Sequence, residues 1–362
     1  LRARGAALHR SFKDMGRTLA AWAALWALGL AWTASVMAAP MAPWERELYQ
    51  AAKKEGEVTW YTAHYPTDIA AALCKGFETT YPGIKCNFVR TTAQVAYQRL
   101  TQDEQAGQHI CTVFSSTDLS HYPKLKQDGL LLPYRPHNLD NMVDSLRQYN
   151  DPGNYFVVTS AGLVLIAYNT SLLPADQAPK KWTDLLDPRW KGKIAIGHPG
   201  FSGYVGTWVV LMRKMYGWDY FVQLEKNKPR IGRSINDTVT LLNAREVEVG
   251  ASPDATTLIS RDRGNPLAVV YPEDGTLVMI APTGLIKDGP SPHAGELFEE
   301  YLLSKDAAEI QVKLRSQVVI KGVSVLPGAK SLGEVKTARP TLEEIDKGIP
   351  EVIEQFRDTF GI

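Results

Sequence analysis

Strand-forming segments alternate with helix-forming segments along most of this chain, and that order restricts the fold more than any other feature. After a predicted helix at 44–56, the first half contains predicted strands at 58–61, 85–89 and 110–114, and predicted helices at 69–80, 93–104 and 121–128. Strands separated by helices of about ten residues are typical of βαβ units, which build mostly parallel sheets. We therefore expect the α/β class.

A second set of units follows the extended segment 155–158. Its predicted strands are 163–168, 193–197, 247–251, 267–271 and 276–280, and its predicted helices are 182–186, 204–216, 236–245 and 255–261. The last predicted helices are 294–303, 307–315 and 342–356. Two sets joined by extended segments predict two lobes, each a mostly parallel sheet flanked by helices, with a cleft between them.

The first 38 residues have the pattern of a secretory signal peptide. Five basic residues precede or flank an uncharged apolar run at 19–32, and small residues lead to Ala38. A membrane anchor is the alternative, but this strictly apolar run is shorter than the ~20 residues that span a bilayer. We expect export to the periplasm and removal of residues 1–38.

The charge balance argues against a nucleic-acid partner. Removal of residues 1–38 takes five of the 40 Lys and Arg residues and one of the 39 Asp and Glu residues, leaving 35 basic and 38 acidic side chains. Nucleic acids bind to basic surfaces, and this balance is slightly acidic. The remaining chain of about 320 residues is long enough for two domains.

Two of the three cysteines are placed to form a disulfide. Cys74 lies in a predicted helix and Cys86 opens the following predicted strand, so the two can meet where that helix packs on its strand. Disulfides persist in oxidising compartments such as the periplasm. Two buried free thiols are the alternative. Cys111, at a strand position, is expected to be a small core residue.

Polar residues gather where the predicted strands end. Ligands of open α/β sheets bind beyond the carboxyl ends of the strands. Each of these loops precedes a predicted helix, whose first N–H groups lack partners and carry partial positive charge, so we expect the loops to hold an anion. The candidate ligand-binding residues are His64, Tyr65, Arg90, Thr91, Thr92, Ser115, Ser116, Thr117, Ser202, Gly203, Tyr204, Asn236 and Asp254.

Each candidate also has a simpler explanation. Ser, Thr, Asn and Asp are preferred helix N-caps, so any one of them alone is more simply a cap than a ligand. Arg90 is the strongest candidate for gripping a carboxylate or phosphonate with two hydrogen bonds, and an exposed charge at a strand end is its alternative. Tyr65 and Tyr204 can stack on an organic ligand or pack in the core. Asp254 suits an amine or a hydroxyl donor, so a zwitterion or a polyol acid would fit the whole set.

No catalytic motif is present in the sequence. It contains no Gly-x-Ser-x-Gly, no Gly-Lys-Ser/Thr phosphate loop, no Gly-x-Gly-x-x-Gly after a strand and no His-Glu-x-x-His. The seven histidines are scattered, and the cysteines lack the spacing of a zinc site. We therefore predict a binding protein without a cofactor, a metal or catalytic residues, and a secreted enzyme is the weakest alternative.

The segment 182–194, WTDLLDPRWKGKI, followed by Ser202-Gly203, resembles the entry to the second lobe of periplasmic solute-binding proteins of ABC importers. Other matching pieces, in the expected order, are 77–85, 129–131 and 302–305. The resemblance covers nearly the whole chain after the leader. It is to the branch that holds ferric-ion, aminoethylphosphonate, thiamine and polyamine binders.

This resemblance implies a periplasmic-binding-protein fold of type II, with two lobes joined by hinge strands. Lobe 1 would comprise 43–160 and 279–325, lobe 2 would comprise 161–278, and the helical segment 326–362 would be free to pack on lobe 2. Such a protein closes around a small ligand, works as a monomer and delivers the ligand to a membrane permease. We predict a small organic anion, a carboxylate or phosphonate with an amine or hydroxyls. A ligand sensor for a chemoreceptor would use the same pocket.

Ferric-ion binding is a further alternative within this resemblance. The family's ferric binders carry two adjacent tyrosines after the strand that matches 247–251, where this chain reads Ser252-Pro253-Asp254-Ala255. The family's carboxylate ligand in the first lobe falls near Gln94, which is neutral. Because hard cations prefer anionic oxygen ligands, the sequence disfavours iron.

Overall fold

Two long, buried strands organise the fold in this computed structural model, which describes residues 41–362. Strand β5 (Val157–Asn169) and strand β10 (Thr276–Ile286) are buried along their whole lengths. Strands covered on both faces read as nearly continuous apolar runs, and both sequences have this character. They pair antiparallel from Val157 opposite Thr283 to Val164 opposite Leu277. We call β5 and β10 the central strand pair.

The remaining strands join this pair into one hydrogen-bonded sheet. Its order is β2-β1-β3-β10-β5-β8-β6-β7, with β4 and β11 also on β10 and β9 also on β5. These strands are β1 (Glu57–Thr62), β2 (Lys85–Arg90), β3 (Val113–Ser115), β4 (Leu131–Leu132), β6 (Ile194–Gly197), β7 (Arg230–Gly232), β8 (Val249–Pro253), β9 (Leu267–Val270) and β11 (Thr337–Ala338).

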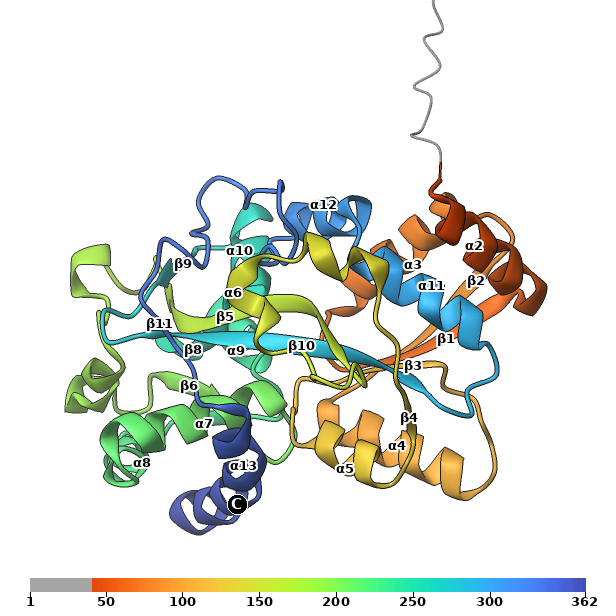
Figure 1. Cartoon of the computed structure of the whole chain (residues 1–362). Helices are drawn as coiled ribbons and strands as arrows, with labels where there is room; N and C mark the ends of the chain where they lie inside the picture. The colour runs from red at the N-terminus through yellow and green to blue at the C-terminus, as the bar shows by residue number, and fades with distance from the viewer. Residues whose placement is uncertain (1–40) are drawn as a thin grey trace, which may run out of the picture. The chain divides into compact units, whose positions relative to one another are not determined.

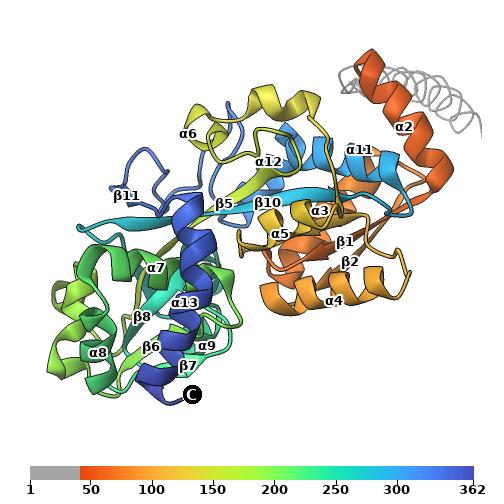
Figure 2. The same ribbon diagram turned by 60° about the horizontal axis from the view of Figure 1, so that its bottom comes forward.

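Most of the parallel pairing lies in two groups of three strands, and the short strand β11 also pairs parallel with β10. β1 pairs parallel with β2 and β3, and β6 pairs parallel with β7 and β8. β3 meets β10, and β8 meets β5, in antiparallel fashion. The two groups therefore lie on opposite sides of the central strand pair, as Figures 1 and 2 show.

Helices cover both parallel groups. Figure 1 shows α3 and α11 on one side of β1 and β3, and α4 and α5 on the other, while α13 packs against α7 and α8 in the other half. The helices are α2 (Pro43–Glu55), α3 (Thr67–Thr80), α4 (Ala93–Gln105), α5 (His121–Gln127), α6 (Asp144–Arg147), α7 (Gly203–Tyr216), α8 (Asp219–Lys226), α9 (Asp237–Asn243), α10 (Asp254–Asp262), α11 (Pro292–Leu302), α12 (Lys305–Lys313) and α13 (Leu342–Phe360). Short 3-10 turns lie at His137–Asn141, Ala175–Gln177, Trp182–Leu186 and Pro188–Trp190.

The central strands are longer than the sequence pattern predicts. We expected separate extended segments at 155–158 and 163–168, because polar Thr159 and Ser160 interrupt the apolar run. The structure has one continuous strand, since both hydroxyls find buried partners: Thr159 Oγ1 bonds Thr283 Oγ1 at 2.6 Å, and Ser160 Oγ bonds the His64 ring at 2.6 Å. The antiparallel pairing of this strand with β10 was not predicted either.

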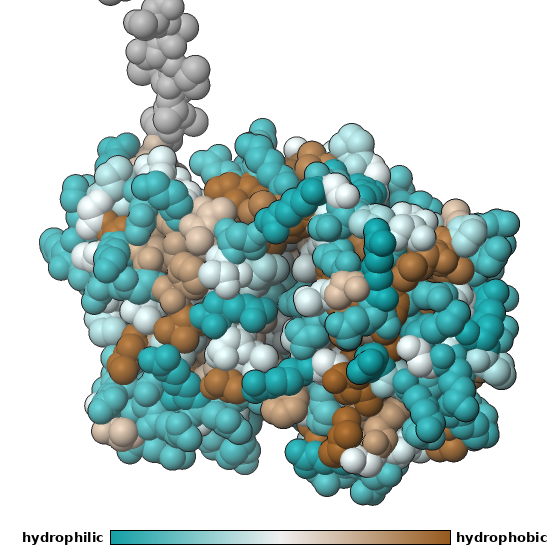
Figure 3. Space-filling view, turned by 180° about the vertical axis from the view of Figure 1, so that it is seen from behind, coloured by the Kyte–Doolittle hydropathy of each residue, from teal (hydrophilic) through white to brown (hydrophobic). Residues whose placement is uncertain are grey.

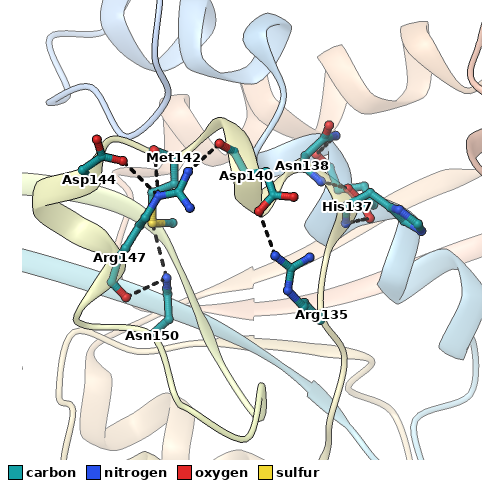
Figure 4. Close-up of polar contacts among 9 residues, drawn as sticks. Arg135, His137, Asn138, Asp140, Met142, Asp144, Arg147 and Asn150 are labelled. Atoms are coloured by element: carbon teal, nitrogen blue, oxygen red, sulfur yellow. Dashed lines mark hydrogen bonds and ion pairs between the residues drawn. The ribbon is translucent and has the colours of Figure 1, made fainter.

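The segment before β5 is fixed by polar contacts that orient the start of that strand (Figure 4). Arg147 donates to the backbone carbonyl of Asp140 at 2.6 Å and forms an ion pair with Asp144 at 3.2 Å. Asn150 then accepts a hydrogen bond from the backbone N–H of Val158 at 2.7 Å. Turn and strand are therefore held together by side chains rather than by an apolar core alone.

The predicted leader, residues 1–38, lies outside the described residues. No helix within residues 41–362 is long and apolar enough to span a bilayer. The face seen in Figure 3 is mainly hydrophilic, with hydrophobic residues in small, separate groups. Large apolar side chains that are more than a third exposed are Val95, Ile110, Leu172, Val222 and Ile362.

The predicted disulfide is confirmed. Cys74 of α3 is bonded to Cys86 of β2, and Cys111 is a free, buried thiol. Burial raises the pKa of the Cys111 thiol, so it stays protonated. The disulfide ties α3 to the strand that ends at Arg90.

We expect the double variant Cys74→Ala/Cys86→Ala to lose about 3 kcal/mol of unfolding free energy, because the bridge closes a short loop in the unfolded chain. Urea unfolding of the oxidised and reduced protein measures this difference. Cys111→Ala is the matched control, and its unfolding free energy should fall on reduction as much as that of wild type. Equal stability of the oxidised protein and the double variant would contradict the expectation.

Candidate functional site

A cavity of about 50 Å³ lies where the carboxyl ends of both parallel groups converge. The loops after β1, β2 and β3 line one side, and the loops after β6, β7 and β8 line the other. Nine of the predicted residues line it: His64, Tyr65, Arg90, Thr92, Thr117, Ser202, Tyr204, Asn236 and Asp254. The ends of the parallel strands therefore bring together side chains that are up to 190 positions apart in the sequence.

Three of the lining residues sit at helix starts without capping them. Thr92, Ser202 and Asn236 precede α4, α7 and α9, and none of their side chains makes a capping hydrogen bond. The hydroxyl of Thr92 is buried with no hydrogen-bond partner among the described residues. Buried polar groups normally have a partner, and the N-cap role does not supply one here. Asn236 differs from the other two, because its Oδ1 accepts from Thr256 Oγ1 at 2.9 Å and the first N–H groups of α9 bond to preceding carbonyls. Thr92 and Ser202, at the starts of α4 and α7, are the uncapped positions that line the cavity.

Arg90 is the cation of the cavity. Its Nε donates to the backbone carbonyl of Tyr65 at 2.8 Å, and within residues 41–362 its guanidinium forms no ion pair. Burial lowers the pKa of Arg90, and the negative charge of Asp237 acts in the opposite direction. The guanidinium remains charged at neutral pH because arginine starts from a pKa above 12. A positive charge without a direct ion-pair partner among the described residues therefore lines the cavity.

His64 links the two sides of the cavity. One ring nitrogen bonds Ser160 Oγ on β5 and the other bonds the Tyr204 hydroxyl on α7, both at 2.6 Å. Burial, helped by the charge of Arg90, lowers the pKa of His64 to about 3. Burial also raises the pKa of the Tyr65 and Tyr204 phenols. All three groups are therefore neutral at physiological pH.

Asp254 lines the cavity, but both of its oxygens already have partners. Oδ1 accepts from the backbone N–H of Leu163 at 3.0 Å and of Ala255 at 2.8 Å, and Oδ2 accepts from Gln317 Nε2 at 2.9 Å. Burial raises the pKa of Asp254 to about 6, while these hydrogen bonds lower it. The carboxylate ties the start of α10 to β5 and to the segment after α12.

Four predicted residues do not line the cavity: Thr91, Ser115, Ser116 and Gly203. Ser115 Oγ is used inside the sheet, where it accepts from Trp60 Nε1 at 2.7 Å. Gly203 has a packing role, because a Cβ there would lie 2.3 Å from the backbone nitrogen of Asp118. The start of α7 thus touches the loop after β3 directly.

Sequence reasoning missed several lining residues. Phe201 lies in the turn before α7, and the guanidinium of Arg233 stacks 4.9 Å from its ring centroid. Thr256 lies in the first turn of α10, where a search of helix first turns would have found it. Ser316 has no local signal, because only the bridge between Gln317 and Ala161 brings it to the site.

Residues 113–324 match the family model described as bacterial extracellular solute-binding protein. The chain belongs to this family. A "Putative 2-aminoethylphosphonate-binding periplasmic protein" of Salmonella typhimurium is 26% identical over 175 residues, which cover 45% of this chain and about half (51%) of that relative. "Iron uptake protein A1" of Synechocystis is 22% identical over 309 residues, covering 81% of this chain and 84% of the relative.

The fold is shared with solved two-lobe periplasmic binding proteins. The periplasmic binding protein AfuA from Actinobacillus pleuropneumoniae, solved with fructose-6-phosphate bound, superposes with a TM-score of 0.76 at 23% identity. The match covers 85% of this chain and 99% of that one. The predicted fold and family are therefore confirmed, and this chain is a bacterial extracellular solute-binding protein with the fold of periplasmic binding proteins.

The raised pKa of Asp254 predicts a pH dependence of stability. A carboxyl whose pKa is higher in the folded state stabilises the fold below its unfolded pKa of about 4, and this stabilisation is lost as the pH rises through about 6. Relative to Asp254→Asn, wild type should therefore lose about 2 kcal/mol between pH 4 and pH 7. Urea unfolding of both proteins across this range measures the difference, and parallel curves would contradict it.

Proposed function

We propose that this chain is the substrate-binding component of an ABC importer and that its substrate is a small organic anion. A carboxylate or phosphonate that also carries an amine or hydroxyl groups suits the lining. The observation that carries the proposal is Arg90, a partly buried cation without an ion pair beside uncapped helix starts. A charge removed from water is costly unless a counter-charge compensates it, and an anionic ligand supplies that counter-charge.

The named ligands of two related proteins support an anion. The Salmonella relative is named for 2-aminoethylphosphonate, and the Actinobacillus protein was solved with fructose-6-phosphate. Both ligands are small organic anions that carry additional polar groups. The hydroxyls of Thr92, Thr117 and Ser202 suit such groups, because each can both donate and accept a hydrogen bond.

We further propose that the protein closes by a hinge motion. Residues 43–160 and 279–325 would form lobe 1, and 161–278 would form lobe 2, with β5 and β10 as the hinge strands. The contact of His64 with Tyr204 and that of Gly203 with the loop after β3 would then join the two lobes. A monomer of this kind, exported after loss of residues 1–38, would present its closed surface to the membrane permease.

Ferric ion is the second candidate, because one relative is an iron uptake protein and because His64, Tyr65 and Tyr204 converge in the cavity. Iron(III) prefers anionic oxygens. Burial raises the pKa of both phenols, and Asp254 already accepts three hydrogen bonds. The lining therefore favours an organic anion over this cation.

The same lining favours binding over catalysis. The contact between Ser160 and His64 resembles a nucleophile and its base. A histidine with a pKa of about 3 is a weak general base at neutral pH, because effective bases titrate near the working pH. The role of ligand sensor for a chemoreceptor remains compatible with the same cavity, and the identity of the membrane partner separates it from transport.

A thermal-shift screen of the protein without residues 1–38 tests the proposal. The compounds are 2-aminoethylphosphonate, fructose-6-phosphate, a set of hydroxy and dicarboxylic acids, and ferric citrate. A ligand at 100 times its Kd should add about 2.7 kcal/mol of stability and raise the Tm. We expect at least one organic anion to do so. A shift with iron and with none of the organic anions would overturn the proposal.

We expect Arg90→Ala to raise the Kd for the anion found in that screen by tenfold or more, which corresponds to about 1.4 kcal/mol. The unfolding midpoint of the free protein should not fall, because the lost guanidinium has no ionic partner there. Arg230→Ala is the matched control, since Arg230 is exposed at the opposite end of β7. Isothermal titration calorimetry measures both, and an unchanged Kd in Arg90→Ala would remove Arg90 from the site.

A further inference from the structure

The closed cavity is too small for more than the head group of an organic anion. A buried water needs roughly 10–15 Å³ of such space, so a cavity of about 50 Å³ holds the equivalent of about four waters. A carboxylate or phosphonate with one or two carbons fits that space. A longer ligand must extend beyond it while the lobes are closed.

A second hollow adjoins this cavity. It measures about 250 Å³, and it shares two lining residues, Pro66 and Thr256, with the cavity. One wall comes from the start of α3, and the other comes from α9, α10 and the turn after α10. We call this hollow the groove.

The charges on the groove lining cancel. Asp68 of α3 and Arg263 of the turn after α10 form an ion pair at 3.0 Å and so link the two walls. Both side chains are about half exposed or more, so the pair contributes little to stability by itself. A ligand group in the groove therefore meets no net charge.

The other polar groups of the groove are amides and hydroxyls. Asn243 Nδ2 donates to Ser260 Oγ at 2.9 Å, and Asn265 Nδ2 donates to the same oxygen at 3.0 Å. Ser260 Oγ in turn donates to Asn243 Oδ1 at 3.2 Å. The second N–H of Asn243 and the amide oxygen of Asn265 are then a donor and an acceptor for an alcohol. Ile259 and Val239 add apolar surface that can pack against carbon atoms.

We propose that the groove is a second subsite, which holds the uncharged, hydroxyl-bearing tail of an elongated organic anion. The anionic end of the same ligand lies at Arg90, so this inference rests on the proposed function. The pair of Asp68 and Arg263 closes beside the tail and holds the two walls together. The ligand class is then a phosphorylated or carboxylated polyol rather than a short, simple anion.

Two matched pairs of probes test this inference by calorimetry. Methyl phosphate is compared with sorbitol 6-phosphate, and glycolate is compared with gluconate, so that each pair keeps its head group and differs in the tail. We expect the polyol member of at least one pair to bind at least tenfold more tightly. Asn243→Phe, which fills the groove, should abolish this preference and leave the Kd of the short probe unchanged.

Thr240→Phe is the matched control for bulk, since Thr240 is exposed on the same helix and does not line the groove. It should bind both members of each pair as wild type does. Ser260→Ala removes a hydroxyl without adding bulk and should reduce the preference several-fold, which keeps the test valid if Asn243→Phe folds poorly.

Equal affinity for the short and long probes in wild type would overturn the second subsite and leave the proposed function intact. An equal loss for both probes in Ser260→Ala, or a preference that survives both groove variants, would also overturn it. If wild type binds no organic anion at all, the proposed function fails, and the groove proposal fails with it.

Discussion

The antiparallel pairing of β5 with β10 is the constraint on which the rest of the structure depends. The β1–β3 group attaches to this pair through β10 at 283–285, and the β6–β8 group attaches through β5 at 164–168. The two groups therefore join opposite ends of one two-stranded connection, which spans from Val157 to Val164 on β5. Each group is held internally by parallel pairing and by its own helices, so within the sheet the described residues link the two groups through this short connection.

Polar groups of this connection form hydrogen bonds with residues that line the cavity. Ser160 bonds His64, and the backbone of Leu163 bonds Asp254. Both contacts lie on the stretch of β5 between the two parallel groups. The lining of the cavity and the connection between the two groups therefore share the same hydrogen bonds.

The sequence predicted the local units better than the way they combine. Periodicity and turn residues located nearly every strand of the two parallel groups, and the spacing of Cys74 and Cys86 located the disulfide. The continuity of β5 was missed, because Thr159 and Ser160 break the apolar pattern and their buried partners come from elsewhere in the chain. Helix α8 and strand β7 were also missed, since both are short.

In the candidate site, too, local features were predicted from the sequence and contacts between distant segments were not. The positions of the strand ends predicted most of the lining residues, because parallel strands place their carboxyl ends at one edge of the sheet whatever side chains they carry. Ser115 and Ser116 were misjudged as lining residues, since strand-end position does not fix which side a side chain takes, and both point into buried hydrogen bonds with Trp60 and His121. Ser316 could not be predicted as a lining residue, because its position depends on a β-bridge between distant segments.

The charge of the cavity depends on how burial changes the pKa of each ionisable side chain that lines it. Desolvation favours the neutral form of every ionisable side chain: it lowers the pKa of His64 and raises the pKa of the Tyr65 and Tyr204 phenols, so all three are neutral at physiological pH. Arg90 does not follow them, because the pKa of a guanidinium starts too high. Asp254 is the one acid on the lining, and the protein's own donors occupy its oxygens. The cavity therefore presents the positive charge of Arg90 and neutral donors and acceptors to a ligand, while the charge of Asp254 is directed into hydrogen bonds with the protein's own N–H groups.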